Sequence, residues 1–95
     1  MDRKDLVIIG SGPAGLSAAV YAQRAKLDQV VIEKEMFSGG QIVTTDRVDN
    51  YLGLYGESGY NLAIKFREHA DALGVPFMEA EVNKIEDKGD YKVIY

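Results

Sequence analysis

The residues with the clearest chemical meaning form a glycine-rich stretch near the start of the chain, GSGPAG at positions 10–15. We expect Gly10 to permit a tight turn, Gly12 to let the backbone approach a pyrophosphate, and Gly15 to allow a helix to pack closely on a strand. Pro13 and Ala14 fall where a first helical turn would begin, and proline is tolerated there because its missing amide proton has no helical partner. This spacing is typical of a dinucleotide site.

The segments on either side decide how much weight these glycines carry, because glycines also serve in ordinary turns. An apolar run at residues 6–9 precedes the stretch, and a helical pattern of small residues follows it at residues 16–22. The predicted order is therefore strand, glycine turn and helix. The N-terminus of such a helix offers amide donors and a positive dipole to an anion, so the context predicts nucleotide binding.

Glu33 is the second candidate for chemistry. It ends an apolar strand predicted at residues 29–33 and lies 18 positions after Gly15. An acidic side chain at about 20 residues from the glycines accepts hydrogen bonds from the ribose of adenosine. Because a carboxylate would repel a 2′-phosphate, NADP is disfavoured at this position, whereas FAD and NAD both remain open.

Composition limits the possible partners. The chain has 95 residues and a net charge of −4, and its eleven Lys and Arg residues are scattered among fifteen acidic ones, which disfavours nucleic-acid binding. There is no cysteine and one histidine, so we expect no disulfide, no dithiol redox centre and no metal site. No apolar run approaches the ~20 residues of a membrane span. We therefore expect no membrane partner and a cytoplasmic location.

The hydrophobic pattern predicts an α/β fold. The expected elements, in order, are strand 5–9, helix 13–25, strand 29–33, helix 58–73, strand 75–78, and strands 81–87 and 91–95. The first three form a right-handed crossover, which starts a parallel sheet. The last two read as part of an antiparallel β-meander. Residues 34–57 show no regular period, and ordered loops of that length are usually functional.

His69, the single histidine of the chain, is a candidate for acid or base chemistry. The helical period places it beside Phe66 and Leu73, on the face that also carries Leu62 and Ala70. We therefore expect a half-buried packing histidine and no acid or base catalysis from it.

Three stretches resemble the low-molecular-weight thioredoxin reductase family of FAD-dependent pyridine nucleotide-disulfide oxidoreductases. The glycine-rich stretch together with residues 18–22 is similar to the family's first FAD motif. Residues 39–42 with 44–45 resemble its flavin-contacting loop, and residues 48–51 resemble its following Val-acid-Asn-aromatic segment. The likeness continues through the second predicted helix and residues 82–85, so it covers nearly the whole chain.

The resemblance implies that the N-terminal glycine motif serves FAD, in a Rossmann-like domain of which residues 1–95 are the N-terminal part. In this family NAD(P)H binds a separate inserted domain, which also carries a redox Cys-x-x-Cys, and a C-terminal segment completes the flavin site. We expect those parts to lie outside this chain, so that the chain alone is inactive. The parent protein would be a homodimeric oxidoreductase that passes electrons from NAD(P)H through FAD to a disulfide of a thioredoxin-like partner.

The motif and the resemblance together give the expected cofactor-binding residues: Gly10, Gly12, Pro13, Ala14, Gly15, Glu33, Lys34, Gly40, Gln41, Thr45, Asn50 and Val82. The amide of Gln41 both donates and accepts, which suits the mixed edge of an isoalloxazine ring. Thr45 and Asn50 add polar groups near the flavin by the resemblance. The backbone of Val82 would contact adenine, and Lys34 would contact the adenosine half. No catalytic residue is expected.

Two residues depart from the family pattern, since Tyr51 stands where tryptophan is common and Leu52 where proline is frequent. The subfamily therefore stays open. One alternative is a ferredoxin or flavodoxin-NADP reductase of the same fold, in which the Cys-x-x-Cys would be missing. Another is a non-catalytic nucleotide-binding module.

Overall fold

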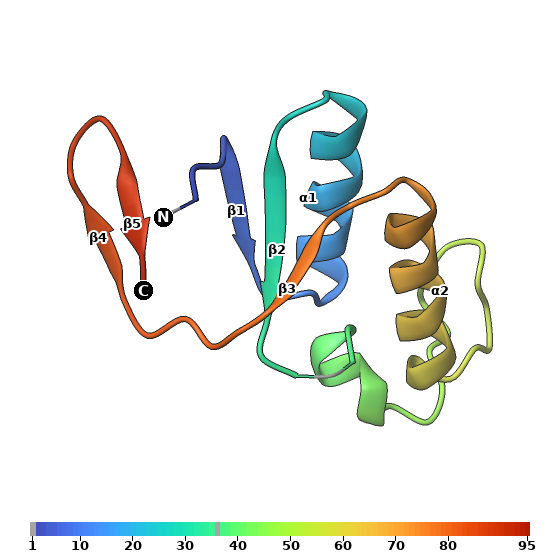
Figure 1. Cartoon of the computed structure of the whole chain (residues 1–95). Helices are drawn as coiled ribbons and strands as arrows, with labels where there is room; N and C mark the ends of the chain where they lie inside the picture. The colour runs from blue at the N-terminus through green and yellow to red at the C-terminus, as the bar shows by residue number, and fades with distance from the viewer. Residues whose placement is uncertain (1, 36) are drawn as a thin grey trace.

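The computed structural model describes residues 2–35 and 37–95. Its elements, in chain order, are β1 (Leu6–Ile9), α1 (Pro13–Arg24), β2 (Gln29–Glu33), the 3-10 helix η1 (Gly40–Thr44), α2 (Gly59–Ala72), β3 (Phe77–Glu79), β4 (Ile85–Asp87) and β5 (Lys92–Ile94) (Figure 1). In this described part, no helix has the length and apolar character needed to cross a membrane.

A three-stranded parallel sheet forms the centre of the molecule, in the order β1-β2-β3. Val7 pairs with Val30 and Val31 with Phe77, so β2 has a neighbour on both sides. This explains why its sequence QVVIE is almost continuously apolar and buried. Both helices cover the same face of the sheet (Figure 1). The expected α/β class with a parallel sheet is confirmed.

The core fills the space between this sheet face and the two helices. Leu16 and Ala19 of α1, Val31 of β2, Ala70 of α2 and Val75 form one buried cluster, and none of them is more than 5% exposed. Phe66 and Phe77 pack against its edge. Because the cluster joins both helices to the central strand, it holds the carboxyl ends of β1 and β2 in fixed positions.

The ends of the helices follow ordinary capping chemistry. Ser58 caps α2, since its Oγ accepts a hydrogen bond from the amide of Asn61 at 3.1 Å. Gly74 follows the helix with φ of +80°, in the left-handed region that glycine adopts without strain. The amide of Val75 then donates to the carbonyl of Ala70 at 3.1 Å. Val75 thus bonds back to α2, and the pairing with β2 starts only at the carbonyl of Pro76, which accepts from the amide of Val31 at 3.0 Å. β3 runs from Phe77 to Glu79, so the expectation of a strand from residue 75 was wrong.

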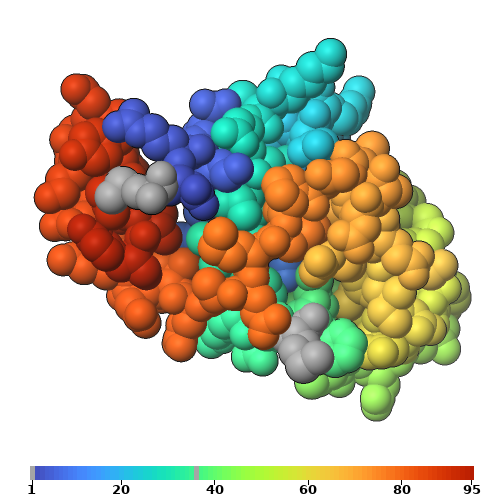
Figure 2. Space-filling view, viewed as in Figure 1, coloured from blue at the N-terminus to red at the C-terminus, as the bar shows by residue number. Residues whose placement is uncertain are grey.

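The antiparallel part is shorter than expected. β4 and β5 pair as a hairpin with Ile85 opposite Ile94, separate from the parallel sheet. The predicted strand 81–87 was too long, because residues 81–84 lie outside any strand and β4 pairs with β5 over residues 85–87. Backbone hydrogen bonds from Asn83 to Tyr95, from Tyr95 to Lys84 and from Lys88 to Tyr91 extend the pairing beyond the two strands. Figure 2 shows the hairpin as a lobe at one end of the molecule.

Two further expectations were corrected. The segment 34–57 is not wholly irregular, since it contains η1 and an isolated antiparallel bridge between Val48 and Glu57. His69 is exposed and not half-buried. It lines a groove of about 380 Å³ between α1 and α2, together with Leu73, which is 39% exposed. The groove stays open beside His69 because the helices meet through the small residues nearer the sheet, such as Ala19 and Ala70.

Candidate functional site

The candidate site lies at the carboxyl edge of the parallel sheet, where the turn from β1 enters α1. Gly10 has φ of +96°, and its amide donates to the carbonyl of Ile32 at 2.8 Å. Gly12 is the N-cap of α1 and gives no side-chain hydrogen bond, Pro13 follows it, and the first turn carries no acidic residue. The amides of Ala14 and Gly15 therefore have no side-chain cap, and the positive end of the helix is open to an anion.

Two glycines of this turn have opposite surroundings. A Cβ built on Gly15 would overlap the carbonyl oxygen of Gly10 and lie 3.3 Å from Cγ2 of Ile8. Gly15 is therefore needed for α1 to approach β1. A Cβ built on Gly12 would meet only the carbonyl oxygen of Gly39, at 4.0 Å. The space beside Gly12 is free for a ligand that approaches the backbone, which is the fit a pyrophosphate requires.

Glu33, at the end of β2, turns its carboxylate toward the glycine turn. Its Oε1 accepts from the amide of Ser11 at 3.0 Å and from Ser11 Oγ at 2.6 Å, while Oε2 accepts from the amide of Glu35 at 3.1 Å. Partial burial opposes ionisation, but the hydrogen bonds from Ser11, Glu35 and the backbone of Lys34 outweigh it and lower the pKa of Glu33. The site thus holds a fixed anionic acceptor beside the glycine turn.

A second glycine pair lies against the first turn. The amide of Gly39 donates to the carbonyl of Ser11 at 2.8 Å. Gly39 has φ of +120°, and a Cβ there would overlap that of Ala63 in α2. Gly40 has φ of +62°, and its Cβ would lie 3.6 Å from Cα of Gly12. The loop at residues 38–40 therefore fits between α2 and the glycine turn only with glycine at position 39.

The 3-10 helix that follows is fixed by its backbone. The amide of Gly59 donates to the carbonyl of Thr45 at 2.8 Å, and a Cβ on Gly59 would overlap the carbonyl oxygen of Ile42. The side chains of Gln41 and Thr45 stay exposed. Gln41 and Thr45, two residues expected to contact the flavin, thus lie on a turn, and α2 holds the backbone of that turn in place.

The remaining expected residues lie at the margins of this edge. Lys34 is exposed directly after Glu33, and Val82 is partly buried two residues beyond Ala80, whose amide donates to the carbonyl of Glu33 at 3.0 Å. Asn50 is exposed in the long loop, where its neighbour Tyr51 packs against the ring of Phe66 at 5.0 Å. The structure brings the glycines and Glu33 together, whereas among residues 2–35 and 37–95 no hydrogen bond joins Asn50 or Val82 to the glycine turn.

Sequence reasoning missed the partners that hold the site. Ser11 is fully buried and binds Glu33, and Gly59 sets the distance between η1 and α2. Arg67 is a third, since its Nη1 donates to Oγ of Ser38 at 3.0 Å. The sequence did carry a signal for Ser11, since a small polar residue between two glycines can bind an acid that ends the neighbouring strand. The pairing of Arg67 with Ser38, 29 residues apart in the chain, left no local signal.

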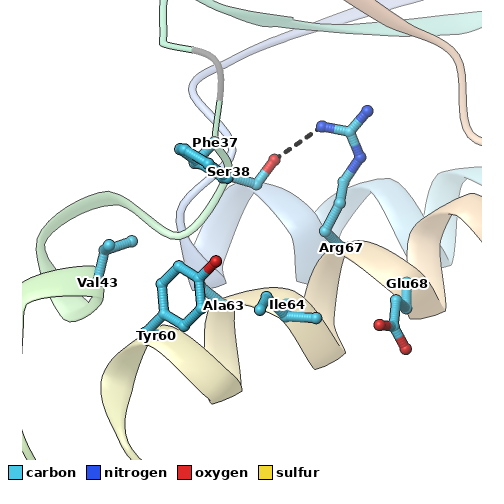
Figure 3. Close-up of a pocket in the computed structure, with 8 residues that line it drawn as sticks. All are labelled: Phe37, Ser38, Val43, Tyr60, Ala63, Ile64, Arg67 and Glu68. Carbon is cyan, nitrogen blue, oxygen red and sulfur yellow. Dashed lines mark hydrogen bonds between the residues drawn. The ribbon is translucent and has the colours of Figure 1, made fainter.

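A hollow of about 240 Å³ lies between the loop and α2 (Figure 3). Its lining consists of Phe37, Ser38, Val43, Tyr60, Ala63, Ile64, Arg67 and Glu68. The hydrogen bond between Arg67 and Ser38 crosses its upper side in the figure, and the rings of Phe37 and Tyr60 meet edge to face at 6.3 Å.

Comparison with known proteins relates this arrangement to oxidoreductases. The family described as pyridine nucleotide-disulphide oxidoreductase matches residues 4–94. The thioredoxin reductase of Ureaplasma parvum serovar 3 is 47% identical over 90 residues, which make up 95% of this chain and 29% of that protein. Its similarity thus extends over nearly all of the present sequence.

Solved structures give the same result. The thioredoxin reductase of Lactococcus lactis, in its FR conformation, matches with a TM-score of 0.93 and 41% identity, over 98% of this chain and 30% of that one. A ferredoxin-flavin thioredoxin reductase from Clostridium acetobutylicum matches with a TM-score of 0.92 and 36% identity, over 100% of this chain and 33% of that one. The chain spans about a third of the length of these relatives, and it corresponds to their N-terminal part.

Proposed function

We infer, because this chain belongs to the pyridine nucleotide-disulphide oxidoreductase family, that it is the N-terminal part of the FAD-binding domain of a longer, thioredoxin-reductase-like flavoprotein. The observation that carries the inference is the juxtaposition of the ionised Glu33 with the open side of Gly12. A carboxylate at the position of Glu33 can accept hydrogen bonds from a ribose, and the space beside Gly12 can admit a pyrophosphate.

Each residue expected to bind the cofactor has a role in this proposal. The ribose of the adenosine half binds Glu33, and the pyrophosphate lies at Gly12 and the free amides of the first turn of α1. Lys34 and the backbone of Val82 contact the adenosine. On the flavin side, Gly40 lets the backbone come close, while Gln41, Thr45 and Asn50 offer polar groups to the ring.

FAD held by these residues would supply the redox chemistry, namely acceptance of a hydride and transfer of electrons to a second acceptor. The residues of this chain bind and orient it. In the proposed parent protein, a homodimer, NAD(P)H is the donor and the disulfide of a thioredoxin-like protein is the acceptor, and both act through parts other than these residues.

A second candidate differs in the electron donor. The similarity to the ferredoxin-flavin thioredoxin reductase favours reduction of the flavin by ferredoxin in place of a nicotinamide. Both candidates use the same FAD site, so they differ only in what reduces it.

The test uses the longer protein that carries this chain. After purification, its absorbance spectrum and extracted cofactor report whether FAD is bound. Anaerobic mixing with NADH, NADPH or reduced ferredoxin then shows which donor bleaches the flavin absorbance. A colourless protein that takes up no FAD when titrated would contradict the FAD assignment, and bleaching by ferredoxin alone would select the second candidate.

A further inference from the structure

We propose that Arg67 is a positioning residue for the dinucleotide site, because it holds the loop at residues 38–40 against the glycine turn. This inference rests on the proposed function. Arg67 lies on α2 and does not belong to the glycine motifs, and it acts on the cofactor only through Ser38 and the glycines that follow it.

The guanidinium of Arg67 is fixed by three contacts. Nη1 donates to Oγ of Ser38 at 3.0 Å, and Nε donates to Oδ1 of Asp71 at 3.0 Å. Its Cζ lies 3.4 Å from the centroid of the Phe77 ring, in a cation-π arrangement. Arginine suits this position because its planar fork can donate in two directions while one face stacks on a ring. Figure 3 shows the guanidinium directed at Ser38.

Ser38 passes this constraint to the site within two residues. Its side chain is buried, with 6% of the residue exposed, so its hydroxyl needs a partner inside the protein. The next residue, Gly39, donates its amide to the carbonyl of Ser11, and Ser11 in turn binds the carboxylate of Glu33. Gly40 lies next to Gly12, since a Cβ built on Gly40 would be 3.6 Å from Cα of Gly12. A continuous series of contacts thus runs from Arg67 to the ribose acceptor.

The glycine pair explains why such a restraint is needed. Glycine loses more backbone freedom on ordering than any other residue. Two adjacent glycines with φ of +120° and +62° would sample many other conformations without neighbours that hold them. On one side the loop is tied to Ser11, and on the other to Arg67. Without the hydrogen bond from Arg67, the cofactor would have to order the Gly39–Gly40 backbone when it binds, and this would lower its affinity.

The experiment compares Arg67→Met, Ser38→Ala and their double variant in the longer protein. Methionine keeps the length of the arginine stem over Phe77 but loses the donors. Lys65→Met is the matched control, since Lys65 is an exposed cation of the same helix. We measure the Kd of FAD in apoprotein, the unfolding midpoint, and the hydrogen exchange rate of the Gly39 amide without cofactor.

We expect Arg67→Met and Ser38→Ala each to weaken FAD by about 10-fold, the value of one lost charged hydrogen bond, with the double variant no weaker than Arg67→Met. The Gly39 amide should exchange faster in both. Lys65→Met should stay within about twofold of wild type. If Arg67→Met does not fold, Ser38→Ala carries the same comparison.

Unchanged FAD affinity and Gly39 exchange in the folded variants, or additive effects in the double variant, would overturn the proposal and leave Arg67 a purely structural residue. Failure of the wild-type protein to bind FAD would instead overturn the proposed function. The exchange rate of the Gly39 amide separates the two results, because it tests the restraint without any cofactor.

Discussion

At the scale of single residues, the site depends on a carboxylate whose position is set before any ligand arrives. Both oxygens of Glu33 already accept hydrogen bonds from the protein, and each oxygen can accept more than one. The bonds from Ser11 and the Glu35 amide fix the side chain and favour its ionised form. Such an acceptor would lose little conformational entropy on binding the ribose hydroxyl that the proposed function assigns to it.

Replacing Glu33 with alanine in the longer protein should weaken FAD by about 10-fold to 150-fold, because hydrogen bonds to a charged group contribute about 1.5 to 3 kcal/mol each. Titration of apoprotein with FAD, followed by flavin fluorescence, measures the change. Glu35→Ala is the matched control, since it removes a nearby exposed carboxylate and keeps the amide that binds Glu33. Equal affinity in Glu33→Ala and wild type would sink the ribose assignment.

The lowered pKa of Glu33 predicts a pH dependence of folding. Because its folded pKa is below the ordinary value of 4.5, the unfolded chain binds more protons between the two values, and stability falls as pH drops through that window. Above the ordinary value the contribution is fully present. Ser11→Ala should reduce this dependence, since it removes the strongest hydrogen bond to the carboxylate. Urea unfolding between about pH 3 and 6 tests it, and identical slopes in both proteins would contradict the assignment.

Gly12→Val should abolish cofactor binding while it leaves the fold in place. Its φ of −70° is allowed for any residue, and a Cβ there clashes with nothing in the protein. A valine side chain would instead occupy the space that the pyrophosphate needs. We expect a colourless but cooperatively unfolding variant, whereas Gly15→Val should fail to fold because its Cβ overlaps Gly10. Retained yellow colour in Gly12→Val would place the pyrophosphate elsewhere.

At the scale of elements, close backbone contacts between neighbouring segments build the site, and glycines permit them. Gly15 lets α1 meet β1, Gly39 lets the loop meet α2, and Gly59 lets α2 meet η1. The first turn of α2 is therefore a packing surface as much as a helix start. The hydrogen bond that the amide of Gly59 donates to the carbonyl of Thr45 holds the end of η1, whose polar side chains are exposed.

Gly59→Ala should destabilise the protein by about 1 to 3 kcal/mol although alanine is the better helix former, because the added methyl overlaps the carbonyl of Ile42. Chemical unfolding monitored by circular dichroism measures the loss. Asn61→Ala, at an exposed position two residues on, should instead stabilise the helix by a few tenths of a kcal/mol. A neutral or stabilising Gly59→Ala would mean that α2 can move away from η1 freely.

Comparison of these elements with the sequence shows which features local chemistry specifies. β1, α1 and β2 were predicted to within a residue, because an apolar run, a glycine turn and a small-residue helix are all local signals. The exposure of His69 was missed, since it depends on how α1 and α2 pack against each other. The length of β4 is set by its pairing with β5, and the packing of η1 depends on Gly59 of α2. These features depend on contacts between residues far apart in the chain, and the hydrophobic periodicity of a segment carries no information about such contacts.

At the scale of the whole molecule, the chain is more extended than a compact domain of its length. Its radius of gyration is 14.4 Å, against about 12 Å for a compact chain of this size. The β4–β5 hairpin forms a lobe beside the sheet (Figure 2). Large apolar side chains stay exposed on the parallel strands, with Ile9 at 48% and Met78 at 44%. These residues leave one sheet face and one sheet edge available to further structure.

We therefore expect the isolated 95-residue chain either to aggregate or to bind the adenosine half of FAD weakly, and to show no nicotinamide-dependent reductase activity. Isothermal titration of soluble chain with FAD and with ADP measures this directly. Similar, weak affinities for the two ligands are the expected result. Sub-micromolar FAD binding, far tighter than that of ADP, would show that these residues complete the site without other segments.

The bond between Ser11 and Glu33 also bears on the order of folding. It joins residues 22 positions apart, one in the turn between β1 and α1 and the other at the end of β2, and Gly39 adds a bond from still farther along the chain. A nascent chain that has formed β1 and α1 alone has the glycine turn but no acceptor opposite it. The site forms only when β2 docks, so under the proposed function cofactor binding would report on completion of the crossover, and a cofactor that binds only the docked form would stabilise it.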